Sequence, residues 1–163
     1  MSWTHYLFGF SGRINRAKYW LFVLVGFLFM GAGFLAVLPY ILIERPSTSD
    51  LHQSVSPLKL LTLIAEGIVI LAYIVASFAI LVKRLHDRNK SGWWLLIFFV
   101  LPSAFDAIND PKIVPTWHIP PISSLALVLA SVVLSIWGFF EIALLRGTAG
   151  DNRFGADPLA QAA

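Results

Sequence analysis

The chain has no cysteine among its 163 residues. This absence rules out disulfide bonds, thiolate zinc sites, iron–sulfur ligation and a lipid anchor on cysteine. Charge is also scarce, since only 13% of the residues are Asp, Glu, Lys or Arg, against about a quarter in soluble domains. The hydrophobic share is 58% and the mean hydropathy is +0.76. Because the bilayer is the natural solvent for such a composition, we expect an integral membrane protein.

Short motifs for metal, nucleotide or catalytic chemistry are missing as well. The four histidines lack the short spacing of a histidine metal site; they are His5, His52, His86 and His118. Residues 147–155 are glycine-rich, but no Lys-Ser or Lys-Thr pair closes them as in a nucleotide-binding loop. Adjacent His86 and Asp87 do not by themselves give the geometry of a catalytic triad. We therefore expect no enzyme, no metal, no cofactor and no nucleic-acid partner.

Long apolar runs predict the fold, because a helix needs about 20 apolar residues to cross a bilayer. Three runs meet this length, at about residues 19–43, 60–82 and 122–145. A further segment, 92–108, is apolar for only about 14 residues and contains Pro102. We expect it to cross as a short or tilted span, with a re-entrant segment as the alternative. The sequence thus predicts a single all-α membrane domain over residues 1–163, a bundle of four transmembrane helices with a short amphipathic N-terminal segment.

The distribution of Lys and Arg predicts the orientation. Three lie in the N-terminal segment 1–18, four in the loop after the second predicted span, and two in the tail 146–163. Four spans place these nine on one side of the membrane and the other three on the opposite side. Since loops rich in Lys and Arg stay in the cytoplasm, we expect a cytoplasmic N-terminus and tail. A re-entrant third segment would move only the tail to the outer side.

Three polar segments interrupt the apolar background. The first carries Gly12-Arg13 and Arg16 ahead of Tyr19-Trp20. The second reads Arg84-Leu85-His86-Asp87, followed by Ser91-Gly92-Trp93-Trp94, and the third has Asn152-Arg153-Phe154-Gly155 at its centre. With these motifs in this order, the sequence resembles the domain of unknown function 805 family of bacterial inner-membrane proteins. The resemblance covers most of the chain and implies a bacterial inner-membrane location, but no activity, because the family has none assigned.

If four segments span the membrane, the three polar segments meet at its cytoplasmic face as one polar cluster. Its predicted members are Arg13, Arg16, Arg84, His86, Asp87, Asn152, Arg153 and Asp157. We expect a structural clamp between Arg84 and Asp87, in a protein with a structural or accessory role. The sharper alternative is an anion site, because arginine binds phosphate or carboxylate through paired hydrogen bonds. Its ligand would be an anionic lipid headgroup or a phosphate.

Two acids lie inside predicted spans. An ionisable group within a bilayer costs a few kcal/mol and is a functional candidate by default. Glu66 lies near the start of its span and Glu141 near the end of its own, close to Arg146. We expect both to reach the interface or to form ion pairs. The alternative function is an oligomeric small transporter or channel component that uses Glu66 and Glu141, with a second copy or another membrane protein as partner.

Overall fold

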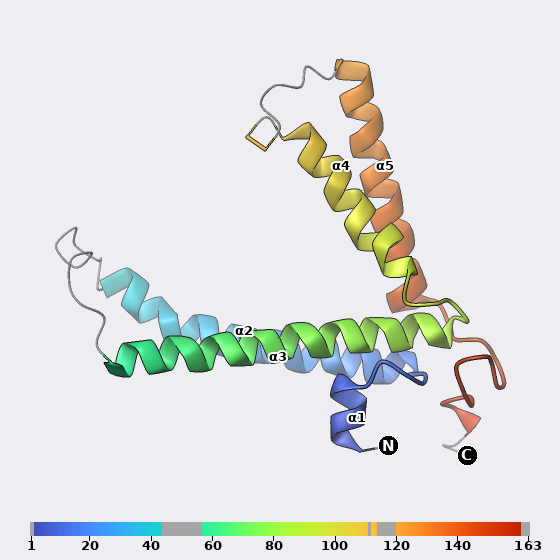
Figure 1. The fold of residues 1–163 in the computed structure, drawn as a ribbon, viewed down its shortest axis with the longest axis horizontal. Coiled ribbons are helices and arrows are strands. Elements are labelled where there is room, and N and C mark those ends of the chain that lie inside the picture. Colours follow the sequence, from blue (N-terminus) through green and yellow to red (C-terminus); the bar gives the residue numbers. More distant parts are fainter. Residues whose placement is uncertain (1, 44–56, 111, 114–119, 161–163) are drawn as a thin grey trace.

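A computed structural model describes residues 2–43, 57–110, 112–113 and 120–160. All named elements in these ranges are helical, and the only strand-like feature among them is an isolated bridge between Asn152 and Gly155. In chain order the elements are α1 (Trp3–Phe8), α2 (Arg16–Ile43), α3 (Pro57–Asp87), η2 (Leu96–Val100), α4 (Leu101–Asn109), α5 (Pro121–Phe139) and η3 (Phe140–Leu144). The segments η2 and η3 are single π-helical stretches continuous with α4 and α5 (Figure 1).

The helix boundaries follow local sequence signals. Ser2 caps α1, where its Oγ accepts a hydrogen bond from the backbone N–H of His5 at 3.3 Å. Pro120 is the N-cap of α5 and Pro121 its first residue, positions at which proline removes no helical hydrogen bond. Pro102 is the second residue of α4 and directly follows the π-helical stretch η2. After α3 the chain turns through Asn89, which has a positive φ of 56°. Asn tolerates this left-handed conformation better than most residues do.

Within the described residues, three helices are long and apolar enough to cross a membrane: Arg16–Leu35, Leu60–Asp87 and Pro121–Leu144. They match the first, second and last predicted spans. The predicted third span becomes the shorter apolar helix Leu96–Asn109, whose 14 residues extend for about 21 Å. The all-helical membrane-type fold is therefore confirmed with three candidate spans rather than four.

The helices form two hairpins that diverge from a shared end, as Figure 1 shows. In the first hairpin α2 lies beside α3, and in the second η2 and α4 pack along α5. Within the described ranges, α2 and α3 approach the second hairpin through η3, and neither has a Cα atom near one of α4 or α5. The predicted four-helix bundle is thus not confirmed. Helices that are apolar on every side lack a marked packing face, so the sequence could not distinguish a bundle from two hairpins.

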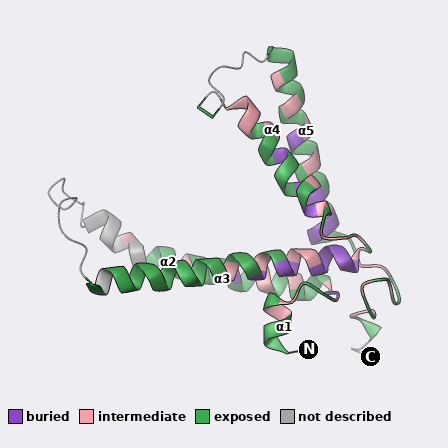
Figure 2. Ribbon diagram, viewed as in Figure 1, coloured by how far each residue is buried: buried purple, intermediate pink, exposed green. Residues whose placement is uncertain are grey.

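Burial is concentrated at the shared end, while the hairpins expose apolar side chains along most of their length (Figure 2). The apolar core at this end consists of Leu85, Leu95, Phe98 and Ile142. Phe98 packs closely on Gly138, where an added Cβ would lie 2.7 Å from the Phe98 Cβ. This small core brings the start of the second hairpin onto the end of α3 and thereby positions the polar residues next to it.

Candidate functional site: the polar junction

We call the shared end of the hairpins the polar junction, because the N-terminal segment, the end of α3 and the tail meet there. At its centre is Asp87, the last residue of α3, with 3% of its surface exposed. Its Oδ1 accepts hydrogen bonds from Arg13 Nε at 3.2 Å and Arg13 Nη2 at 3.1 Å. Its Oδ2 accepts one from Arg84 Nη1 at 2.5 Å. Two guanidinium groups thus compensate one carboxylate away from water, as a buried charge requires.

Arg13 also ties the tail to this centre. Its Nη2 donates to the carbonyl oxygen of Thr148 at 2.6 Å, and its Nη1 donates to those of Gly150 at 2.7 Å and Gly155 at 3.2 Å. With the two bonds to Asp87, all five N–H groups that a guanidinium possesses are in use. Arg13 is therefore a structural link between segments more than 70 residues apart in the sequence and has no donor left for an external ligand.

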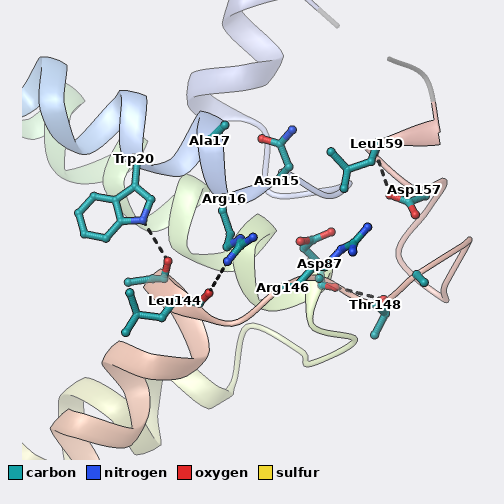
Figure 3. A pocket seen from close by; sticks show the side chains of 13 residues that line it. Asn15, Arg16, Ala17, Trp20, Asp87, Leu144, Arg146, Thr148, Asp157 and Leu159 are labelled. Carbon is teal, nitrogen blue, oxygen red and sulfur yellow. Dashed lines mark hydrogen bonds between the residues drawn. The ribbon is translucent and has the colours of Figure 1, made fainter. Parts of the chain in front are cut away.

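The last carbonyl groups of the second hairpin are capped by side chains of the first. The four carbonyls belong to Ile142, Ala143, Leu144 and Leu145. Arg84 donates to the Ile142 carbonyl through Nε at 2.7 Å and to the Leu145 carbonyl through Nη2. Trp20 Nε1 donates to the Ala143 carbonyl at 3.1 Å, and Arg16 Nη1 donates to the Leu144 carbonyl at 2.9 Å (Figure 3). A helix end carries unsatisfied carbonyls and partial negative charge, so cationic donors stabilise it.

The tail packs directly on the end of α3. The backbone N–H of Thr148 donates to the carbonyl oxygen of Asp87 at 2.8 Å, and its Oγ1 donates to the same oxygen at 3.1 Å. Asn152 Nδ2 donates to the carbonyl oxygen of His86 at 2.9 Å. Gly147 lies so close that an added Cβ would be 2.0 Å from Asp87 Oδ2. A side chain at position 147 would thus displace the carboxylate from its position.

The remaining predicted residues lie around this contact. The Asp157 carboxylate accepts hydrogen bonds from the backbone N–H groups of Leu159 and Gly150, both at 2.9 Å. These bonds hold the pKa of Asp157 below its usual range. The His86 ring stacks on Phe154 with centroids 3.9 Å apart, and its Nδ1 lies 3.2 Å from the Gly12 carbonyl oxygen.

Arg153 completes the predicted set. Its Nη2 donates to the carbonyl oxygen of Asn89 at 3.1 Å, and its guanidinium lies over the Phe154 ring. The structure thus brings all eight residues of the predicted polar cluster to the polar junction. It uses Arg13 and Arg84 as internal links, whereas Arg16 and Arg153 are exposed. Anion binding by this cluster stays a prediction.

The two predicted intramembrane acids have different surroundings. Glu141 is buried in η3, where its Oε2 accepts from Arg88 Nε at 3.2 Å and its Oε1 accepts from Trp137 Nε1 at 3.3 Å. Lys90 Nζ lies 3.7 Å from the same Oε1. Glu66 is exposed on α3, and no other residue in the described ranges forms a hydrogen bond or ion pair with its side chain. The structure therefore places the two acids in separate environments.

A cavity of about 490 Å³ opens beside the polar junction, between the start of α2, the end of η3 and the tail (Figure 3). Its charged lining residues are Arg16, Asp87, Arg146 and Asp157. We did not include Arg146 in the polar cluster predicted from the sequence, where it was considered as an orientation charge and as a neighbour of Glu141; Glu141 instead pairs with Arg88 and Lys90. Its position directly after the last predicted span, next to Gly147, is the sequence signal that could have identified it as a site residue. Among the described residues, no group of three His, Asp or Glu is arranged to hold a metal ion; His52 and His118 lie outside them.

Comparison with known proteins gives consistent matches. The sequence profile of a family described as protein of unknown function (DUF805) matches residues 7–156. Inner membrane protein YhaI of Escherichia coli (strain K12) is 31% identical over 151 residues, which are 92% of this chain and 86% of YhaI. Inner membrane protein YhaH of the same strain is 28% identical over 150 residues, 92% of this chain and 87% of YhaH. The uncharacterized protein YiiR, also of this strain, is 25% identical over 169 residues, 96% and 90% of the two chains. No solved structure matches.

Proposed function

Because the chain belongs to the DUF805 family of bacterial inner-membrane proteins, we propose that it is a non-enzymatic membrane protein with a structural or accessory role. In this role the polar junction clamps the two hairpins together and offers a binding surface to an anionic lipid headgroup or a phosphate. The observation that carries the proposal is the buried Asp87 carboxylate between Arg13 and Arg84. Since Arg13 also donates to carbonyl groups of the tail, this ion pair links the three polar segments that are far apart in the sequence.

The occupancy of the polar side chains supports a structural role over a catalytic one. Both carboxylate oxygens of Asp87 accept from arginine, and the His86 ring is stacked on Phe154. A general base needs an exposed lone pair within reach of a substrate proton. Asp87 has no such lone pair and does not contact the His86 ring, so the proposal includes no catalytic residue.

The proposal places the polar junction at the cytoplasmic face. Nine of the twelve Lys and Arg residues belong to the three segments that meet there, and the N- and C-terminal ends lie at the same end of the molecule (Figure 1). The distribution of positive charge in short loops sets orientation toward the cytoplasm. This supports the expectation that the N-terminus and the tail share the cytoplasmic side.

Replacement of Asp87 by Asn tests the clamp. The substitution keeps the shape of the side chain but leaves Arg13 and Arg84 without their counter-charge. Breaking a buried ion pair costs about 3–5 kcal/mol, so we expect a large drop in folded yield and in the melting temperature in detergent. The matched control is Asp106→Asn, an exposed acid on α4, which we expect to change stability by less than about 0.5 kcal/mol. Equal melting temperatures of the two variants would contradict the clamp.

A second candidate function is the oligomeric transporter or channel component. Its support is now Glu66 alone, an exposed carboxyl group on an apolar helix, because Glu141 is engaged by Arg88 and Lys90. Such a group in a spanning helix is costly unless a partner or a hydrated path compensates it. Solute-dependent flux in liposomes that disappears in Glu66→Gln would favour this candidate over the accessory role.

A further inference from the structure

We propose that the cavity beside the polar junction binds the phosphodiester group of an anionic phospholipid between Arg16 and Arg146. This inference rests on the proposed function, because it takes the polar junction to lie at the membrane surface. It adds the residues that contact the ligand and the chemical class of that ligand. Two arginines from separate segments line the cavity, one at the start of α2 and one directly after η3.

The two arginines that line the cavity, Arg16 and Arg146, have unused hydrogen-bond donors, unlike Arg13 and Arg84 in the polar junction. Arg13 uses all five of its N–H groups, and Arg84 donates through each of its three nitrogens. Arg16 donates through Nη1 alone, to the carbonyl oxygen of Leu144. The Arg146 guanidinium donates to no residue in the described part of the chain, and both side chains are exposed. They are therefore the guanidinium groups of this cavity that can receive phosphate oxygens.

The backbone adds donors and the carboxylates limit the charge of the ligand. Gly147 and Ala149 line the same cavity, and their backbone N–H groups donate to no other described residue. Asp87 is already paired with two arginines, and both oxygens of Asp157 accept backbone N–H groups. Two guanidinium groups thus accompany one carboxylate, Asp157, that forms no salt bridge within the described residues and lies in the field of Arg146. This balance suits a single negative charge, which is the charge of a phosphodiester.

The apolar part of the lining distinguishes a lipid from a free phosphate. Trp20, Leu144 and Leu159 line the cavity and are each exposed by about two fifths. The cavity also lies at the ends of two candidate spans, Arg16–Leu35 and Pro121–Leu144. Trp at such a boundary favours the headgroup level of a bilayer. A phosphodiester held by Arg16 and Arg146 would therefore place its glycerol and the start of its acyl chains against this apolar wall.

Native mass spectrometry of the full chain in detergent, with added phosphatidylglycerol, tests the site. We expect Arg146→Gln to weaken retention of phosphatidylglycerol about tenfold, since the charge-assisted hydrogen bond between the guanidinium and the phosphate is lost. Because the Arg146 side chain donates no hydrogen bond to any described residue, we expect this variant to keep the fold. The matched control is Lys18→Gln, which removes the same charge from an exposed residue of α2 that does not line the cavity. Ala17→Phe fills the cavity without changing charge and should reduce retention as well.

Each outcome decides a separate point. Equal retention by Arg146→Gln and Lys18→Gln would overturn the site, and so would undiminished retention by Ala17→Phe. Displacement of phosphatidylglycerol by millimolar inorganic phosphate would overturn the lipid assignment and give the cavity to free phosphate. Equal retention of phosphatidylcholine would overturn the requirement for net negative charge. If Arg146→Gln loses phosphatidylglycerol while Asp87→Asn remains stable, the lipid site is supported and the clamp is rejected. If Arg146→Gln retains phosphatidylglycerol while Asp87→Asn is destabilised, the clamp is supported and the lipid site is rejected.

Discussion

At the scale of single residues, the polar junction depends on a close approach between Gly147 and the Asp87 carboxylate. An added Cβ at position 147 would lie 2.0 Å from Asp87 Oδ2, so Gly147→Ala forces the carboxylate away from Arg84. We expect the variant to lose about 1–3 kcal/mol of stability, as overpacking of a closely packed site does. Thermal unfolding in detergent measures the loss.

Gly31→Ala is the matched control for this prediction. Gly31 lies within α2, and an added Cβ there would have no neighbour within 4 Å. Alanine in a helix interior is favoured over glycine by up to about 1 kcal/mol, so we expect an unchanged or slightly raised melting temperature. A loss at Gly31 equal to that at Gly147 would show that the close approach to Asp87 is not the cause.

The sequence identified the residues of the junction and the pairing of Arg84 with Asp87, but not the second pairing of Asp87 with Arg13. Arg13, Arg84 and Asp87 stood out because charges are rare in this chain, and that rarity made them predictable. The number of hydrogen bonds that each arginine uses internally depends on where the carbonyl groups of residues 142–155 lie in space, which spacing along the chain does not encode. For the same reason the spacing did not place Arg146, whose guanidinium donates to no other described residue, in the predicted polar cluster.

At the scale of elements, the end of η3 depends on Arg84. Its guanidinium reaches Ile142, Leu145 and Asp87 at once, which the single ammonium group of lysine cannot do. We therefore expect Arg84→Lys to lower the unfolding free energy by about 3 kcal/mol or more, because at least two charge-assisted bonds are lost. Thermal unfolding and folded yield in detergent check this expectation.

Arg153→Lys serves as the control at this scale. Arg153 is exposed and makes one hydrogen bond, to the carbonyl oxygen of Asn89, which lysine can retain. We expect a change below about 0.5 kcal/mol. If both Arg-to-Lys variants lose the same stability, the geometry of the guanidinium at position 84 is not what caps the helix.

The elements themselves were largely predictable. Apolar length and flanking charges located α2, α3 and α5, because the thickness of a bilayer fixes how many residues a span needs. The packing of these helices was not predictable, since apolar faces all round them provide no preferred neighbour. Contacts of η3 with α2 and α3 decide the arrangement, and they include apolar packing of Leu85 on Ile142 and side-chain hydrogen bonds to three backbone carbonyls of η3.

At the scale of the whole molecule, sidedness is the main prediction. The cysteine-free chain allows single cysteines to be labelled with a membrane-impermeant maleimide. We expect Ser11→Cys and Ala156→Cys, both exposed near the polar junction, to react only from the cytoplasm. Ser123→Cys, at the opposite end of α5, should react from the other side. Labelling of positions 11 and 156 from opposite sides would contradict a shared cytoplasmic face.

The capping of η3 by the first hairpin also has a consequence for the order of biosynthesis. A chain emerges from the ribosome with its N-terminal part first, so Arg16 and Arg84 are synthesised before Leu144 and Leu145, whose carbonyl groups they bind. The terminal carbonyls of the second hairpin are therefore made after their donors. The donors, in turn, lack these acceptors until residues 142–145 are translated, so synthesis of the end of the second hairpin is the step that joins it to the first.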